Sequence, residues 1–330
     1  MRAAVYSRYG PPEVVDIQEV PKPIPGVRDV LIRVRATTVC AADWRLRKAD
    51  PFIARIFSGL IRPKKTRILG MEFSGTVEAV GAAVTLFRPG DEVFGGTLFR
   101  FGAHAEYVCM PESGLLATKP ANQTLEDAAA FFFGGMTVLS FLDKAKISPG
   151  DRVLVYGASG SVGVFAVQIA KYYGAHVTGV CSTANVELVR SLGADEVIDY
   201  TKEDFSRAGG VYDMVFETVG KAGWGRCLRS LKRGGRYVVV AGVGRKWFIS
   251  NMVVGWLVGL WTSAAGTAKF ISMPTKNGNE RLKLLKDLIE TGKLRTVIDR
   301  CYPLDQIREA HRHAEAGHKK GHALVLVERV

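Results

Sequence analysis

Residues 151–183 decide the fold of this chain, and they read DRVLVYGASGSVGVFAVQIAKYYGAHVTGVCST. The apolar run over 152–158 has the length and composition of a buried strand, and the run over 162–174 has apolar residues at helical spacing. A second apolar, β-branched run follows over 176–182. A strand, a helix and a strand in this order predict a parallel βαβ unit, whose sheet is covered by helices.

The loop between the first strand and the helix is rich in glycine and reads GASGSVG over 157–163. Glycines at such a turn let the chain reverse tightly, let the backbone approach a pyrophosphate and let the helix pack closely on the strand. The free N–H groups of the helix N-terminus then bind the phosphates. The predicted pyrophosphate contacts are Gly157, Ser159, Gly160, Ser161, Val162 and Gly163. The alternative is a glycine-rich turn without a ligand; a P-loop is excluded because no Lys follows the last glycine.

The end of the second strand bears on the choice of coenzyme. Proteins that bind NAD place Asp or Glu there to accept the ribose 2′-OH, whereas this strand ends in VCSTAN, without an acid. The side chains of Ser182, Thr183 and Asn185 can instead receive the 2′-phosphate of NADP, with Arg190 and Lys202 as nearby cations. We therefore predict NADPH in preference to NADH. Alternatively, Ser182 and Thr183 cap the following helix, and the two roles are compatible.

The sequence on either side of this unit predicts an α/β protein with a second, β-rich part. Apolar strands and amphipathic helices continue to alternate up to about residue 243, which predicts a doubly wound parallel sheet with helices on both faces. A helix is expected to begin at Thr124, with Asp127 three residues on. The first third of the chain reads as short strands with frequent Gly and Pro turns, interrupted by a basic, irregular segment over 45–67.

Composition limits the class of protein. The chain has 330 residues, 47% hydrophobic and 23% charged, which is typical of soluble globular proteins and excludes disorder, collagen and a multi-span membrane protein. The net charge of +13 attracts anions such as nucleotide phosphates, acidic lipid or nucleic acid. The five cysteines form no C-x-x-C pair, so neither a disulfide framework nor a zinc ribbon is predicted. Reduced cysteines and an N-terminus without an apolar signal region predict a cytoplasmic protein.

Further segments occur in a recognisable order. They read VCAADWRLR, ILGMEFSGTVEAVG, GDEVFGG, GAHAEYV, GGMT, LGADEVIDY and GHKKGHALV. With the glycine-rich loop they resemble the zinc-independent medium-chain dehydrogenase/reductases of the quinone oxidoreductase (zeta-crystallin-like) branch, over nearly the whole chain. The resemblance implies a Rossmann domain at 124–273, between two segments of a GroES-like catalytic domain at 1–123 and 274–330. It also implies NADPH-dependent hydride transfer to a quinone, enone or related carbonyl, usually in a homodimer.

The resemblance suggests residues for the substrate cleft, of which the candidates are Cys40, Asp43, Met71 and Thr137. Cys40 stands where relatives often carry Asn near the nicotinamide, and its alternative is a buried core thiol. Asp43 and Arg47 match an Asp-x-x-x-Arg element, which either shapes the nicotinamide end of the cleft or forms an ion pair along a helix. Thr137 matches a threonine near the nicotinamide.

Other coenzyme contacts are implied further along the chain. Tyr200 matches a tyrosine on the 2′-phosphate side, and its alternative is a half-buried residue at a strand end. Val219-Gly220 and Gly242-Val243 end two strands, where ligands of open α/β sheets bind. His322 replaces a Lys that is usual in the family's tail, which weakens its assignment as a coenzyme contact.

A sister branch of alcohol dehydrogenases uses catalytic zinc, which needs three protein ligands. Cys40 resembles the first ligand, but Met71 replaces the His of a Gly-His-Glu motif, and the third-ligand region FGGMT has no Cys. The four-cysteine structural site is absent too, so no zinc is predicted. The C-terminal histidines are interpreted as a solvated helix or tail rather than as a metal site; they are His311, His313, His318 and His322.

The uncharged stretch over 247–268 is as long as a membrane span, which takes about 20 residues. In the family this region contributes to the substrate cleft and leads to the strand that pairs two subunits. The alternative is peripheral membrane contact, with Trp256 and Trp261 at the interface and the basic segment 45–67 on acidic lipid. No RNA-binding motif is present, so nucleic acid is not expected. A non-enzymatic lipid- or RNA-binding protein on this fold and a zinc-free alcohol or aldehyde reductase are the alternative functions.

Overall fold

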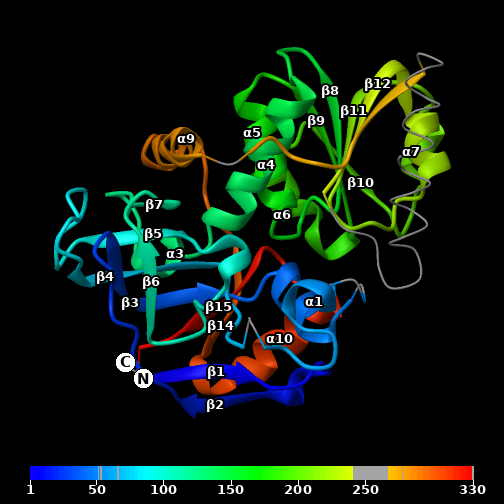
Figure 1. The fold of residues 1–330 in the computed structure, drawn as a ribbon. Helices are drawn as coiled ribbons and strands as arrows, with labels where there is room; N and C mark the ends of the chain where they lie inside the picture. The colour runs from blue at the N-terminus through cyan, green and yellow to red at the C-terminus, as the bar shows by residue number, and fades with distance from the viewer. Residues whose placement is uncertain (51, 53, 65–66, 241–266, 277, 329–330) are drawn as a thin grey trace. The chain divides into compact units, whose positions relative to one another are not determined.

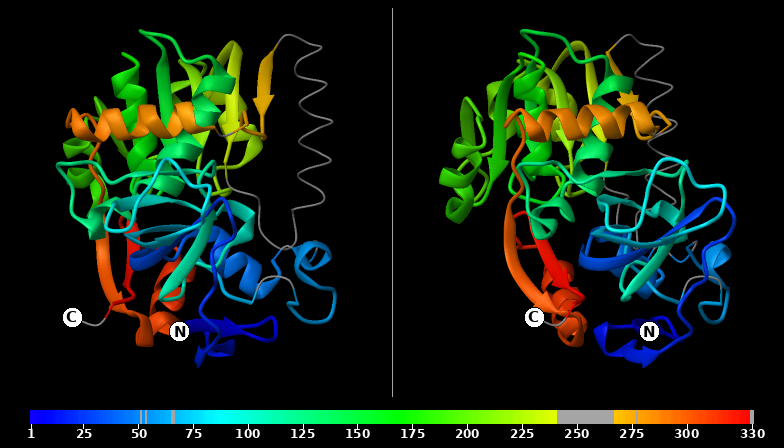
Figure 2. Two further views of the ribbon diagram at one scale, coloured as in Figure 1. Left: turned by 60° about the vertical axis from the view of Figure 1, so that its left-hand side comes forward. Right: turned by 90° about the vertical axis from the view of Figure 1, so that its left-hand side faces the viewer.

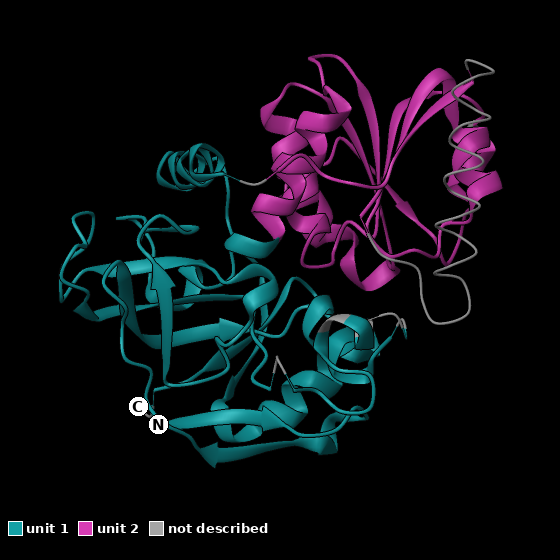
Figure 3. Cartoon of the chain, viewed as in Figure 1, with its two compact units in different colours: residues 1–133, 278–330 teal, residues 134–277 magenta. Residues whose placement is uncertain are grey.

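The computed structural model describes the chain except for residues 51, 53, 65–66, 241–266, 277 and 329–330. The described residues form two compact units (Figure 3). Unit 1 comprises residues 1–133 and 278–330, and unit 2 comprises residues 134–277. Each unit has its own sheet and its own core, and each is described separately below.

Unit 2 is built on a six-stranded parallel sheet in the order β10-β9-β8-β11-β12-β13. Its strands are β8 (Arg152–Tyr156), β9 (His176–Cys181), β10 (Glu196–Asp199), β11 (Tyr212–Glu217), β12 (Leu231–Val239) and β13 (Ala268–Ile271). Its helices include α5 (Gly163–Tyr172), α6 (Val186–Ser191) and α7 (Trp224–Ser230), with the 3-10 turns η3 (Thr183–Asn185) and η4 (Phe205–Ala208). Helices α5 and α7 cover opposite faces of the sheet (Figure 1), so the central strands are apolar on both sides.

Unit 1 is β-rich. A seven-stranded sheet contains β14-β15-β3-β4-β5-β7 in that order, β6 pairs with β3, and β1 and β2 form a separate ribbon. The strands are β1 (Arg2–Tyr6), β2 (Val15–Glu19), β3 (Asp29–Thr38), β4 (Glu72–Val80), β5 (Glu92–Gly96), β6 (Tyr107–Pro111), β7 (Leu116–Thr118), β14 (Ile298–Pro303) and β15 (His322–Leu326). The helices are α1 (Ala41–Lys48), α2 (Ala54–Ser58), α3 (Leu125–Ala128), α9 (Asn279–Glu290) and α10 (Ile307–Ala316), and the 3-10 turns are η1 (Pro12–Val14), η2 (Leu98–Arg100) and η5 (Leu304–Gln306).

The two compact units divide the chain at positions that differ from the predicted domain boundaries. The first domain boundary was predicted at 123/124, but residues 124–133 belong to unit 1, because α3 packs on β3, β4 and β5 and Glu126 pairs with Arg35 at 2.8 Å. The division falls inside α4 (Phe132–Ala145). The second boundary lies at 277/278 rather than at 273/274, because the N–H of Thr275 donates to the Ser140 carbonyl at 3.3 Å.

The basic segment and the apolar stretch also differ from expectation. Residues 45–67 were predicted to be irregular, yet α1 and α2 cover part of this segment. Within the described parts of the chain, no helix is long and apolar enough to cross a bilayer. Most of the uncharged stretch, residues 247–266 with Trp256 and Trp261 among them, lies outside the described residues.

Candidate active site

The glycine-rich loop follows β8 directly and leads into α5, as its sequence predicts. Gly157 has φ of +83°, and a Cβ there would lie 2.3 Å from Val219 Cγ2. A Cβ on Gly163 would lie 2.1 Å from the Gly157 carbonyl oxygen, so both positions require glycine. A Cβ on Gly160 would find its nearest neighbour at 3.5 Å, which is ordinary contact. The middle of the loop is therefore open enough for a ligand to approach its backbone.

Polar side chains from this loop and from the end of β9 form one cluster. Asn185 Nδ2 donates to Ser159 Oγ at 3.0 Å and to Ser182 Oγ at 3.2 Å. Asn185 is buried, and among the described residues its Oδ1 has no hydrogen-bond partner. Ser182 makes no side-chain cap bond to the turn that follows, so the capping interpretation of Ser182 is wrong. A buried acceptor without a partner is a position where a bound hydroxyl or amide can donate.

An acidic residue does lie beside the end of β9, but it belongs to the neighbouring strand β10 and not to β9 itself. Asp199, the last residue of β10, pairs in register with Cys181. Its Oδ2 accepts from Thr183 Oγ1 at 2.6 Å, and its Oδ1 accepts from Thr201 Oγ1 at 2.7 Å and Thr201 N at 3.0 Å. The Thr183 hydroxyl bond, with the other bonds and the Lys202 charge, lowers the pKa of Asp199 to about 2. The parallel register of β9 and β10 was the signal that could have revealed it.

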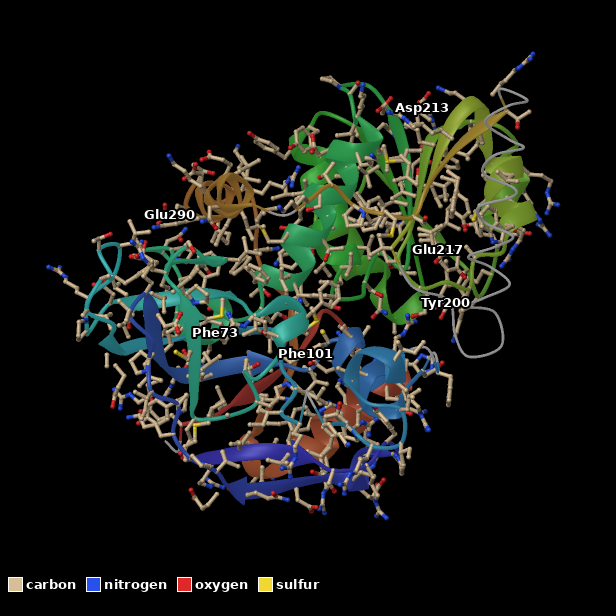
Figure 4. The ribbon with its side chains drawn as sticks, in the orientation of Figure 1. Phe73, Phe101, Tyr200, Asp213, Glu217 and Glu290 are labelled. Carbon is tan, nitrogen blue, oxygen red and sulfur yellow. The ribbon has the colours of Figure 1, made fainter. Side chains whose placement is uncertain are left out.

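A pocket lies beyond the carboxyl end of β10. It has a volume of about 360 Å³ and is lined by Tyr156, Tyr200, Thr201, Lys202, Glu203, Asp204, Phe205, Arg207 and Arg226. Tyr200 is 49% exposed. Figure 4 shows Tyr200 and Glu217 at one end of the sheet and Asp213 at the other. Arg190, the other predicted cation, pairs instead with Glu187 on α6 at 2.8 Å.

The loop after β11 is held by a buried carboxylate. Glu217 is 1% exposed and accepts from the N–H groups of Val219 at 2.9 Å, Gly220 at 2.8 Å and Ala222 at 2.8 Å. Burial raises the pKa of Glu217 despite these bonds. The carboxylate thus fixes the predicted contact Val219 beside the glycine-rich loop. The other predicted pair at a strand end, Gly242-Val243, lies outside the described residues.

Replacing Glu217 by Ala is expected to lower the free energy of unfolding by about 3 kcal/mol, because it leaves three N–H groups without their acceptor. Chemical denaturation measures this loss. Glu187→Ala is the control, since Glu187 is 86% exposed in its pair with Arg190 and its removal should cost under about 1 kcal/mol. Equal losses in the two variants would contradict the role of Glu217.

In unit 1, the predicted cleft residues Cys40, Asp43 and Met71 are buried, and Asp43 is held by hydrogen bonds. Cys40 precedes α1 and lies in the core with Met71. Asp43 is fully buried, and its carboxylate accepts from Cys40 N and Gly70 N, each at 2.8 Å. Arg47, also fully buried, pairs with Glu315. The predicted ion pair between Asp43 and Arg47 is therefore replaced by these contacts: those of Asp43 fix the start of α1, and the pair with Glu315 ties its last turn to α10.

Glu72, beside Met71 in sequence, is a buried ionisable group that the sequence analysis did not single out. Its Oε1 accepts from the Thr38 hydroxyl, and its Oε2 accepts from Phe133 N at 2.6 Å. Burial raises its pKa to about 7. Lys319, which donates to the Gly321 carbonyl, has a pKa lowered to about 8 by burial, while the charges of Cys40 and Glu72 oppose that shift. Burial also raises the pKa of Cys40 well above its usual range.

The buried carboxyl of Glu72 predicts a pH dependence of stability. A pKa raised from 4.5 to about 7 means that the folded state holds this proton more tightly than the unfolded state. The stabilisation by the protonated form is complete below about pH 4.5 and is lost as pH rises through 7. Glu72→Gln stays neutral, so its stability relative to wild type should increase by about 3 kcal/mol between pH 4.5 and 7.5. A pH-independent difference in urea denaturation would contradict this assignment.

Two of the four C-terminal histidines, which were predicted to be solvated, are buried. His311 and His322 are buried, so a solvated helix or tail is wrong for both. His322 Nδ1 lies 3.3 Å from the Val297 carbonyl oxygen, and burial lowers its pKa to about 3. His322 is thus a neutral, buried residue of β15, and its assignment as a coenzyme contact stays a prediction. Thr137 is half-buried on α4.

Among the residues that the structure describes, no group of three His, Cys, Asp or Glu side chains could hold a metal ion.

A parallel sheet with a glycine-rich loop after its central strand is the arrangement of a dinucleotide-binding domain, and in this sequence it lies between two segments of a β-rich unit. Family models agree: an alcohol dehydrogenase GroES-like domain matches residues 26–120, and a domain described as zinc-binding dehydrogenase matches residues 192–325. The predicted fold of a Rossmann domain with a GroES-like domain is confirmed.

Comparison with known proteins identifies the branch of the family to which the chain belongs. It is 32% identical to the 2-methylene-furan-3-one reductase of Solanum lycopersicum, over 98% of this chain and 79% of that protein. It is also 32% identical to the chloroplastic NADPH-dependent alkenal/one oxidoreductase of Arabidopsis thaliana, with the same coverage of 98% and 79%. The solved quinone oxidoreductase of Coxiella burnetii superposes with a TM-score of 0.87 at 28% identity, over 99% of both chains. The chain belongs to the quinone oxidoreductase branch of the medium-chain dehydrogenase/reductases, and it is an oxidoreductase.

Proposed function

We propose that the protein is an NADPH-dependent reductase of quinones, enones or related carbonyls that works without zinc. The observation that carries the proposal is the open glycine-rich loop beside the hydrogen-bonded cluster of Ser159, Ser182 and Asn185, in which Ser159 and Asn185 are buried. Bound NADPH would supply the hydride. The loop backbone would hold the pyrophosphate, the Asn185 Oδ1 would accept from the coenzyme, and Glu217 would keep the neighbouring loop in place.

The pocket beside Tyr200 supports NADPH over NADH. Three cations and two acids line it, Lys202, Arg207, Arg226, Glu203 and Asp204, and Asp204 lies 3.9 Å from Arg226. Lys202 and Arg207 are exposed cations at this end of the sheet and suit the 2′-phosphate. Asp199 is the acid that would favour NADH, but its oxygens already accept from Thr183 and Thr201. These bonds occupy three of the about four acceptor positions of the carboxylate, which leaves less of it for a ribose hydroxyl.

The residues that correspond to the zinc ligands of the alcohol dehydrogenases do not suit zinc. Catalytic zinc needs three protein ligands, and among the described residues no group of three His, Cys, Asp or Glu side chains includes Cys40. Met71 supplies a thioether in place of an imidazole. The buried ammonium of Lys319 and the carboxyl of Glu72 act on each other electrostatically, so a positive charge is already present near Glu72 and would repel a second one. We derive no step through zinc. After hydride transfer the substrate needs one proton, which solvent can supply.

The test is steady-state oxidation of NADPH and NADH by the full chain against a panel of quinones, enones and aldehydes. We expect turnover with quinones or enones, and a kcat/KM for NADPH at least about 10-fold above that for NADH, which corresponds to about 1.4 kcal/mol. Coenzyme binding without turnover on any member of the panel would favour a non-enzymatic binding protein. Turnover of aldehydes alone would favour an alcohol or aldehyde reductase.

A further inference from the structure

The structure exposes an unusual set of side chains after α1. Phe52 and Ile56 are 64% and 63% exposed, and Leu60 and Ile61 are 63% and 90% exposed. These four large, exposed apolar side chains lie within ten residues, on α2 and on the segments before and after it. Exposed apolar side chains that gather in one segment are a candidate interaction surface. This part of the chain lies at the outer edge of unit 1 in both views of Figure 2.

The backbone that carries these side chains is fixed to unit 1. Tyr9 donates its hydroxyl to the Gly59 carbonyl at 2.7 Å, and Lys64 N donates to the Ser58 carbonyl at 2.9 Å. The Arg55 guanidinium lies 4.8 Å from the ring centres of both Tyr9 and Phe52. Gly59 has φ of +133°, and a Cβ there would lie 2.2 Å from the Arg62 carbonyl oxygen. The turn therefore needs glycine, and it presents Leu60 and Ile61 outward on an anchored loop.

The charge of this segment has one sign. Residues 51–67 contain five Lys or Arg and no Asp or Glu. Of these cations, Arg62, Lys64 and Arg67 are exposed, and Arg62 and Lys64 follow Leu60 and Ile61 directly. Apolar side chains next to cations, in a segment without acidic residues, are suited to an anionic bilayer. In such binding the apolar side chains enter the headgroup region, and Lys or Arg contact the lipid phosphates.

We propose that Phe52, Ile56, Leu60, Ile61, Arg62 and Lys64 form a docking surface for anionic lipid bilayers. The apolar members insert at the tip of the anchored turn, and the cations attract the negatively charged headgroups. Binding should need acidic lipid, because neutral headgroups offer no partner for the cations, and it should weaken as salt screens the attraction. The surface lies in unit 1 alone and does not depend on the proposed catalytic activity.

Vesicle flotation of the full chain tests the proposal. With phosphatidylcholine vesicles that contain phosphatidylserine, we expect most of the protein to float at low salt, and little to float with phosphatidylcholine alone. Ile61→Asp should lower the partition coefficient at least about 10-fold, and Arg62→Glu/Lys64→Glu should do the same. Matched controls are Ile24→Asp, whose side chain is 89% exposed, and Lys283→Glu/Lys293→Glu, whose side chains are exposed; both should float as wild type does.

Thermal unfolding of each variant shows whether it is folded. Absence of flotation with either lipid, or equal loss in Ile61→Asp and Ile24→Asp, would overturn the proposal. Equal flotation with neutral and anionic vesicles would overturn the role of the cations. Size-exclusion chromatography tests whether a second copy of this chain, rather than a bilayer, binds the surface. If wild type does not float and Ile61→Asp abolishes self-association, the surface joins two copies of this chain and the proposal is wrong.

Discussion

Replacing Gly160 by Asp is expected to weaken NADPH binding at least about 100-fold, or about 2.7 kcal/mol, while the protein still folds. A Cβ at this position would have no neighbour closer than 3.5 Å, so the protein itself has room for the side chain. The carboxylate would instead occupy the space over the loop and would repel the pyrophosphate. Fluorescence titration with NADPH measures the change, and thermal unfolding confirms the fold.

The control for this variant is Gly278→Asp. Gly278 also has open space around its Cβ position and lies before α9, in unit 1. Both variants add one carboxylate, so Gly278→Asp should bind NADPH as wild type does. An unchanged dissociation constant in folded Gly160→Asp would refute the assignment of the glycine-rich loop.

The double variant Lys202→Ala/Arg207→Ala is expected to lower kcat/KM for NADPH by about 10- to 100-fold and to leave that for NADH nearly unchanged. Both side chains line the pocket beside Tyr200, and hydrogen bonds to charged groups contribute about 1.5–3 kcal/mol each. The two coenzymes differ only in the 2′-phosphate, so a loss confined to NADPH locates that group.

An acidic residue of the same pocket supplies the matched control. Glu203→Ala removes a carboxylate next to Lys202, so it should keep or raise the preference for NADPH. Equal losses for NADPH and NADH in the double variant would show that the cations act on the whole coenzyme or on the fold, and would remove the argument for NADPH.

The sequence predicted the nucleotide domain well because its signals are local. The glycine-rich loop, the apolar strands and the helical spacing all lie within the residues that form each element. The cap at Thr124 is likewise local, and its hydroxyl accepts from Asp127 N at 3.1 Å. Contacts between distant segments were harder to predict. Residues 124–133 join unit 1 because of the sheet under α3, which their own sequence does not reveal.

Pairing across strands explains the errors in the site. Asp199 lies beside the end of β9 through the register with β10, and the C-terminal histidines looked solvated because their neighbours in sequence are polar. His322 pairs in register with Ile298 of the neighbouring strand β14, and its side chain is buried. Glu72 likewise looked like part of a broken zinc motif, whereas its burial and its hydrogen bonds to Thr38 and Phe133 make it a distinct group.

The central claim is NADPH-dependent reduction of a quinone or enone without zinc. The most direct measurement is the rate of NADPH oxidation with the best quinone or enone acceptor, using protein treated with a strong zinc chelator and checked for residual metal. We predict that kcat/KM is the same before and after this treatment, and that it falls with Gly160→Asp. Loss of turnover on metal removal, restored by added zinc, would contradict the account.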